Sequence, residues 1–242
     1  MPPSFIRFDA FSLSNSIGTG HAENQDSYFA DPSTLVFAVA DGVGGYQGGK
    51  EASELAIGAI RNGAGMINSE ASLVSLLQDV HEQLQHTAKS LHYRGMGTTI
   101  AIAKVLPSAS GGGKIITGNA GDSPILLFPK DSEDEIVRVF TDDSYRDSSP
   151  GSMFAITQYL GIEELELKPH TSSRDYSTGD ILMICSDGVT DNLASEAGGA
   201  FRRRTADLSE LVRRYGSARK IVEEAIEARV KPDDMTVVLV FL

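Results

Sequence analysis

The sequence of 242 residues predicts an α+β fold in which β-sheets pack together and helices cover them. Short β-rich runs dominate the chain, and the helical patterns occur in pairs rather than after every strand. That order disfavours a simple alternation of strand and helix. We find no internal repeat and no linker long enough to separate two units, so we expect one domain over residues 1–242.

The expected strands are apolar or alternating runs bounded by turn residues. They cover residues 5–13, 25–30, 35–40, 98–106, 114–119, 125–128, 136–140, 181–185 and 235–242. Helical periodicity predicts helices over 50–63, 71–91, 206–216 and 217–230. In the second of these, one stripe holds the apolar residues Leu73, Leu76, Leu77, Val80 and Leu84. Clusters of Gly, Ser and Pro at 108–113 and 147–152 predict surface loops.

Charge and composition exclude several classes of partner. A formal net charge of −12 and a pI near 4.8 argue against nucleic acid and anionic membrane surfaces. Cys185 is the one cysteine, which rules out an intrachain disulfide and fits a reducing compartment. No apolar stretch reaches the roughly 18–20 residues that span a bilayer, and the N-terminal residues lack a secretory pattern. We expect a soluble, cytoplasmic monomer.

A glycine-rich turn follows the apolar run 35–40 and leaves two interpretations open. Residues 44–50, GGYQGGK, satisfy the G-x-x-x-x-G-K part of a P-loop between a predicted strand and a predicted helix, and Asp187 could act as the Walker B carboxylate. A P-loop needs Ser or Thr at the next position for magnesium, whereas Glu51 would place a negative charge beside the phosphates. The alternative is a turn that lets the helix pack on the strand.

Aspartates stand at the ends of many predicted strands, and they point to a different chemistry. They are Asp26, Asp41, Asp122, Asp187 and the pair Asp233 and Asp234. A buried carboxylate costs several kcal/mol unless it is paired or ligates a metal. One such residue is ordinarily a turn or helix cap, but so many beside apolar runs predict a common acidic pocket. Oxygen ligands alone favour Mg²⁺ or Mn²⁺ over zinc. Two such ions about 3.5–4 Å apart form the clamp used in phosphate-ester hydrolysis.

Two other hydrolase classes do not fit the residues present. A cysteine phosphatase would need an arginine where Asp191 follows Cys185, and the apolar run around Cys185 predicts a buried core residue. The G-x-S-x-G elbow of a Ser–His–Asp hydrolase is absent from the sequence.

The aspartates lie in segments whose order and spacing resemble the metal-dependent serine/threonine protein phosphatases of type 2C, the PPM family. The segments are AENQDSYFA (22–30), FAVADGVGG (37–45), GMGTTIA (95–101), GNAGDSPI (118–125), DILMICSDGVTDNL (180–193) and DDMTVVLV (233–240). Together they extend over nearly the whole chain. Val43 in the DGVGG segment resembles the bacterial-type branch.

The resemblance implies a four-layer α-β-β-α sandwich, with two antiparallel sheets face to face and helices on both outer faces. It also implies hydrolysis of phosphoserine and phosphothreonine in protein substrates by a metal-bridging water, without a phosphoenzyme. The implied cofactors are two Mn²⁺ or Mg²⁺ ions and a third, weaker one.

Carried over by position, the resemblance gives each acidic residue a role. Asp41 would bridge two ions, and Gly42 would offer its carbonyl through water. Asp187 and Asp233 would complete the catalytic pair of ions, and Asp26 would hold one ion or its waters.

Further acidic residues follow in the same way. Asp122 and Asp187 would hold the third ion. Asp191 and Asp234 would support the ligands without contacting a metal.

The sequence departs from the family at three places. The arginine that grips phosphate in the family falls at His21, with Arg7 and Arg94 as conceivable replacements, and Pro124 stands where the family has arginine. The flap segment, at about 142–159, is shorter than usual and leaves substrate choice open. These departures keep an alternative in view, a phosphatase-like binding module that holds metals and turns over poorly.

Overall fold

A computed structural model describes residues 6–14, 23–43, 48–132, 135–146, 154–163, 166–193, 205–228 and 230–242. Within these ranges it contains strands and helices in the proportion expected of an α+β protein. The strands are β1 Arg7–Leu13, β2 Asp26–Asp31, β3 Val36–Asp41, β4 Ile100–Pro107, β5 Gly113–Ala120, β6 Ile125–Phe128, β7 Val137–Arg138, β8 Ser144–Arg146, β9 Phe154–Ile156, β10 His170–Tyr176, β11 Ile181–Cys185 and β12 Met235–Phe241. The helices are α1 Gly49–Gly63, the 3₁₀ turn η1 Ala64–Met66, α2 Glu70–Leu91, α3 Asp187–Leu193, α4 Thr205–Tyr215 and α5 Ala218–Ala228.

Two five-stranded sheets form the centre of the molecule. The first has the order β1-β12-β11-β6-β7 and the second the order β10-β5-β4-β3-β2. Every pairing among the described strands is antiparallel. Strands β8 and β9 pair separately at the base of the flap segment.

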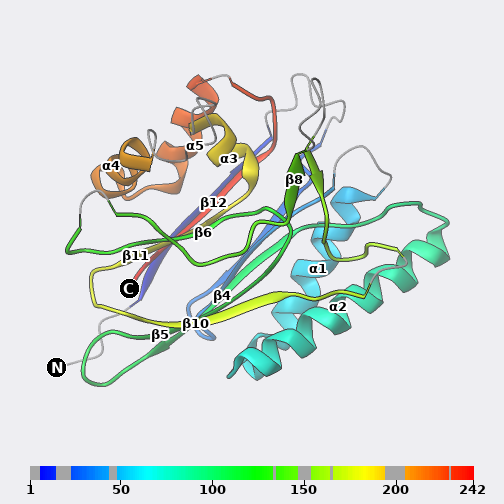
Figure 1. Cartoon of the computed structure of the whole chain (residues 1–242), viewed down its shortest axis with the longest axis horizontal. Helices are drawn as coiled ribbons and strands as arrows, with labels where there is room; N and C mark the ends of the chain where they lie inside the picture. Colours follow the sequence, from blue (N-terminus) through cyan, green and yellow to red (C-terminus); the bar gives the residue numbers. More distant parts are fainter. Residues whose placement is uncertain are drawn as a thin grey trace.

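The sheets and helices stack as four layers (Figure 1). Helices α1 and α2 cover the second sheet, and α3, α4 and α5 cover the first. Three apolar clusters fill the spaces between these layers. One lies between α1, α2 and the second sheet, one lies between the two sheets, and one lies between the first sheet and the helices α3 to α5. The arrangement confirms the α-β-β-α sandwich expected from the resemblance.

Strand β3 shows how the sequence specifies this stacking. Successive side chains of a strand point to opposite faces. Val36, Ala38 and Ala40 therefore pack toward α1 and α2, whereas Phe37 and Val39 pack between the sheets. Because both faces of the sheet are covered, the strand is an uninterrupted apolar run that ends at Asp41, where the chain leaves the core.

The expected elements are largely confirmed, and the differences have local causes. Strand β10 was not expected, because its sequence HTSSRDY is polar and it lies at a sheet edge with mostly exposed or half-buried side chains. Helix α3 was also missed, since it has only 7 residues. Strand β7 is shorter than the predicted run 136–140.

Some expectations fall on residues outside the described ranges. These include the glycines at 44–47, His21 and the predicted loop at 147–152. The flap segment does contain the short β8–β9 pair, where the sequence predicted only a polar loop. None of the helices in the described ranges is both long enough and apolar enough to cross a bilayer.

Candidate metal centre

One end of the sandwich gathers the aspartates that stand at strand ends. Asp26 begins β2 and lies directly opposite Asp41, the last residue of β3. Asp122 follows β5, Asp187 follows β11, and Asp233 precedes β12. Antiparallel pairing makes the end of one strand meet the start of its neighbour, so these aspartates lie at the same end of the sandwich.

The backbone of Asp41 is fixed by two threonines at the start of β4. Thr98 Oγ1 and Thr99 N both donate to the Asp41 carbonyl at 2.8 Å, and Asp41 N donates to Thr99 Oγ1 at 3.0 Å. Next to it, Gly42 lies so close to α1 that a Cβ atom would stand 2.4 Å from the Gly49 carbonyl oxygen. Only glycine fits there, and the Asp41 side chain therefore starts from a well-defined point.

Asp26 is deeply buried, with 8% of its surface exposed. Its Oδ2 accepts hydrogen bonds of 2.7 Å from Ser186 Oγ and from Thr236 Oγ1, two hydroxyls that belong to the other sheet. Its Oδ1 is buried and has no hydrogen-bond partner among the residues that the structure describes. Burial, opposed in part by those hydroxyls, raises the pKa of Asp26 to about 7. An unsatisfied buried carboxylate oxygen fits a site for a cation.

The carboxylates act on one another electrostatically. Burial first, and then the charges of Asp26, Asp187, Asp233 and Asp122, raise the pKa of Asp41 well above its ordinary value. Burial and the charge of Asp187 raise the pKa of Asp122 to about 7. Such mutual repulsion means that the ionised cluster needs positive charge, and an all-oxygen donor set suits Mg²⁺ or Mn²⁺.

Lys231 supplies part of that positive charge. Its Nζ lies 2.8 Å from Asp187 Oδ2, 3.0 Å from Asp191 Oδ2 and 2.8 Å from Asp233 Oδ2. Burial alone would lower the pKa of Lys231, but the charges of these neighbours outweigh burial and raise it. Within the described ranges, no three Asp, Glu, His or Cys side chains lie close enough together to hold an ion as they stand. The carboxylates are therefore close enough to repel one another, because Coulomb forces act over longer distances than metal–ligand bonds.

The remaining acidic residues of the motif lie at the margin of the cluster. Asp234 is 2% exposed, and its Oδ2 accepts a 2.7 Å hydrogen bond from Gln25 N, which fastens the segment before β2 to the start of β12. Asp191 is exposed and contacts Lys231.

The expected replacements for the phosphate-gripping arginine are not found in the cluster. The Arg7 guanidinium stacks 4.0 Å from the centre of the Phe241 ring, at the far end of β1 and β12 from Asp233. Arg94 is exposed in the turn after α2. Pro124 directly precedes β6, and Cys185 is fully buried as predicted. Burial raises the pKa of the Cys185 thiol, which disfavours a nucleophilic thiolate.

A cleft of about 210 Å³ opens beside the cluster, between α3 and the base of the flap. Asp122, Asp187 and Asp191 line its acidic side, and Lys231 and Arg138 add two positive charges. Arg138 was not singled out from the sequence, because nothing in its local pattern distinguishes it from other surface arginines. A cleft with metal-binding chemistry on one wall and cations on its margin is suited to a phosphorylated ligand.

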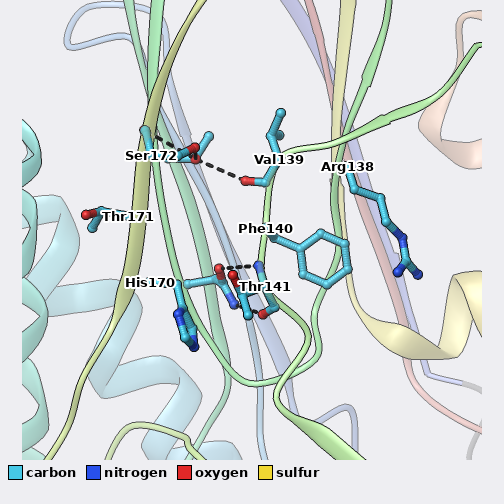
Figure 2. A pocket seen from close by; sticks show the side chains of 9 residues that line it. Arg138, Val139, Phe140, Thr141, His170, Thr171 and Ser172 are labelled. Atoms are coloured by element: carbon cyan, nitrogen blue, oxygen red, sulfur yellow. Dashed lines mark hydrogen bonds between the residues drawn. The ribbon is translucent and has the colours of Figure 1, made fainter.

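A second polar pocket, of about 190 Å³, lies between β10 and the segment that follows β7 (Figure 2). Thr117 Oγ1 donates to the Val139 carbonyl at 3.0 Å, and Asn119 bonds both backbone groups of Thr141. His170 and Arg138 both border this pocket, and the Arg138 side chain extends away from His170 in Figure 2. These bonds hold the chain that leads from β7 to the flap against the second sheet.

Asp143 ties the flap to the acidic cluster. Its Oδ2 accepts a 2.9 Å hydrogen bond from the N–H of Gly121, the residue before Asp122, and its Oδ1 lies 2.9 Å from His170 Nε2. The Asp143 carbonyl accepts from both the N–H and the Oγ1 of Thr157 on the returning side of the flap. Apart from the run TDD at residues 141–143, no local pattern indicates this role.

We expect Asp143→Ala to destabilise the fold by about 1–3 kcal/mol, because the buried Gly121 N–H loses its acceptor. His170→Ala should cost less, since His170 is half-exposed and leaves Asp143 bonded to Gly121. Urea unfolding of both variants measures the difference. Equal stability of Asp143→Ala and the unchanged protein would contradict this role.

The sandwich and its acidic end define a class of protein, the metal-dependent phosphoesterases built on two packed antiparallel sheets. The family model for protein phosphatase 2C matches residues 17–227 of this chain. The chain therefore belongs to the protein phosphatase 2C family, the metal-dependent serine/threonine protein phosphatases, and the P-loop interpretation is wrong. In keeping with this, Lys50 pairs with Glu23.

Individual relatives agree with the family. The chain is 28% identical over 184 residues to the serine/threonine phosphatase stp of Listeria innocua, covering 67% of this chain and 69% of that protein. Among solved structures, PppA of Pseudomonas aeruginosa superposes with a TM-score of 0.76 at 20% identity, covering 98% of both chains. The catalytic domain of the phosphatase PstP, solved with 2 manganese ions, gives a TM-score of 0.72 at 23% identity, covering 98% of this chain and 97% of that one. The resemblance to a bacterial-type phosphatase is confirmed.

Proposed function

We propose that residues 1–242 act as one phosphatase domain that removes phosphate from phosphoserine and phosphothreonine in proteins, using Mn²⁺ or Mg²⁺. One observation carries this proposal. Carboxylates from strand ends far apart in the sequence meet at one end of the sandwich, where Asp26 lies opposite Asp41 and Lys231 joins Asp187 to Asp233. A relative of similar fold was solved with manganese ions, which supports the choice of metal.

Among the described residues, an all-oxygen donor set and the unpartnered buried Oδ1 of Asp26 suit divalent ions, and the carboxylates would draw closer together to hold them. Asp41 would bridge two ions, with Asp187 and Asp233 completing the pair, Asp26 holding an ion or its waters and the Gly42 carbonyl acting through water. When bound, the divalent ions lower the pKa of water and neutralise phosphate oxygens, which allows direct attack on phosphorus.

The third, weaker ion would lie between Asp122 and Asp187. Gly121, the residue before Asp122, donates its N–H to Asp143. The base of the flap therefore fixes the backbone next to Asp122. Asp191 and Asp234 support the arrangement from its margin, Asp191 through Lys231 and Asp234 through the backbone of Gln25.

The chain itself orients the reacting groups. The hydrogen bonds of Thr98 and Thr99 fix the backbone of Asp41, and Ser186 and Thr236 hold one oxygen of Asp26. These contacts place the ligands before substrate arrives, which reduces the reorganisation needed in the transition state.

The cleft beside the cluster would receive the phosphorylated side chain. Arg138 borders the cleft and is permanently charged, so it can contact phosphate oxygens. It would replace the family's arginine, whose position His21 occupies in this chain. His21 remains a proposed phosphate contact when protonated, outside the described ranges. The net charge of −12 supports a phosphoprotein partner over nucleic acid or an anionic membrane. A monomer in the cytoplasm is consistent with the lone buried Cys185.

A second candidate is a phosphatase-like binding module that holds metal but turns over poorly. The ammonium of Lys231 among the acidic side chains favours it, because that charge occupies oxygens that catalysis would use. Turnover distinguishes the two candidates directly.

Hydrolysis of p-nitrophenyl phosphate in the presence of Mn²⁺ tests the proposal. We expect activity that is abolished by excess chelator and restored by added Mn²⁺. Lys50→Ala serves as a control, because a metal mechanism leaves its activity unchanged whereas a P-loop would lose it. Activity that survives the chelator would refute the metal mechanism, and stoichiometric Mn²⁺ binding without turnover would favour the binding module.

A further inference from the structure

Lys231 occupies a position in the acidic cluster that neither the sequence motif nor the family membership explains. It stands two residues before Asp233, and its Nζ lies within 3.0 Å of oxygens from Asp187, Asp191 and Asp233. Asp187 and Asp233 are the residues proposed above to complete the metal pair. A positive charge of the chain itself therefore lies where the proposed ions need negative charge.

The backbone that carries Lys231 is fixed in place. The fully buried Asn192 of α3 accepts from Val230 N and Lys231 N at 2.9 Å each, and its Nδ2 donates to the Lys231 carbonyl at 2.8 Å. The same Nδ2 also donates to Gly188 O at 2.7 Å, one residue after Asp187. One amide thus sets the distance between the lysine and the helix that begins at Asp187.

The side chain of Lys231, in contrast, is free to leave. It is 41% exposed and borders the cleft of about 210 Å³ beside the cluster. A lysine side chain is a flexible four-carbon stem with a compact terminal charge. Nζ can therefore turn into this cleft while the backbone stays in place. The backbone bonds to Asn192 do not depend on where the ammonium lies.

Charge decides what happens when a divalent cation arrives. The ammonium and the ion compete for the same carboxylates, and a residual ammonium a few ångströms from a divalent ion repels it. The divalent ion carries twice the charge and takes oxygen ligands directly, so it displaces the lysine at sufficient concentration. An ion that binds at Asp187 and Asp233 must therefore displace the Lys231 ammonium from these carboxylates.

We propose that Lys231 is a built-in competitor for metal, which neutralises the acidic cluster in the metal-free protein and leaves it when a divalent ion binds. Its effect is to weaken metal affinity and to stabilise the metal-free fold. The phosphatase would then be active only above a threshold concentration of metal set by this side chain. The inference rests on the proposed metal site, and the test below separates the two.

Calorimetric titration of MnCl₂ into chelator-stripped full-length protein measures the effect. Lys231→Met removes the charge at similar length and should tighten Mn²⁺ binding roughly tenfold or more. Lys231→Arg keeps the charge and should stay within a few-fold of the unchanged protein. Lys220→Met removes an equal charge from an exposed pair with Glu223 on α5 and should leave Mn²⁺ affinity unaltered.

Thermal unfolding gives a second readout. In chelator, Lys231→Met should melt at a lower temperature than the unchanged protein, because the cluster loses its counter-charge. Added Mn²⁺ should raise the melting temperature of Lys231→Met more than that of the unchanged protein, since stabilisation grows with affinity. Equal or weaker Mn²⁺ binding by Lys231→Met would overturn the inference and leave the metal site standing. No Mn²⁺ binding by either protein would overturn both.

Discussion

Asp41→Asn is expected to lower the Mn²⁺-dependent kcat/KM for p-nitrophenyl phosphate by about 10²–10⁴. The substitution removes the charge that would bridge two ions, yet it keeps the size of the side chain and the backbone bonds to Thr98 and Thr99. The same loss is expected for Asp187→Asn. Steady-state kinetics with saturating Mn²⁺ measures both.

A matched control separates lost chemistry from lost folding. Asp175→Asn changes an exposed aspartate of β10, paired with Lys114, and should leave the rate unchanged. Asp41→Asn itself should remain folded, with a melting temperature in chelator equal to or above that of the unchanged protein, because it relieves repulsion in the cluster. Full activity of Asp41→Asn would exclude the proposed bridging role.

The metal-free protein is expected to lose stability as the pH rises from about 4 to about 7. The pKa values of Asp26 and Asp122 are each raised to about 7 in the folded protein, against about 3.9 in an unfolded chain. A group with a raised pKa binds its proton more tightly when folded, so its stabilising contribution is complete below the unfolded pKa and is lost as the pH passes the folded one. Each of these raised pKa values corresponds to at most about 4 kcal/mol, so the two groups together lose several kcal/mol, or at least about 10 °C in melting temperature.

Melting curves in excess chelator at pH 5.5 and pH 8 measure the part of this loss that falls above pH 5.5, about half of it. Saturating Mn²⁺ should cancel or reverse it, because metal binding requires ionised carboxylates. Asp122→Asn should show a smaller pH dependence in chelator, since one of the titrating groups is missing. A chelated protein that is equally stable at both pH values would show that the carboxylates do not share one site.

Much of the fold was predictable because the two faces of each layer leave a clear pattern in the sequence. Strand β3 is apolar on both faces because helices cover one side and a sheet the other. The predicted apolar stripe of α2 is fully buried at Leu73, Leu77, Val80 and Leu84, and its fifth member, Leu76, is half-buried. Strand β10 escaped because an edge strand that faces solvent carries no apolar signal.

The candidate site was predictable only in part. Asp41, Asp122, Asp187 and Asp233 were recognisable because a carboxylate at the end of an apolar run is costly unless something uses it. Which groups surround them was not, because partners such as Thr98 for Asp41 come from other strands. The effect of the short flap likewise depends on Asp143, whose contacts with Gly121 and His170 join distant parts of the chain.

The sequence by itself determined that apolar strands end in acidic residues and that this acidity requires cations. Only the tertiary structure decided which cation lies nearest. The placement of Lys231 depends on Asn192, a buried amide on α3 that holds the backbone of the lysine from a different element. Local pattern records the burial of each strand, because burial repeats along the chain. It does not record contacts between elements, which arise only when the layers pack.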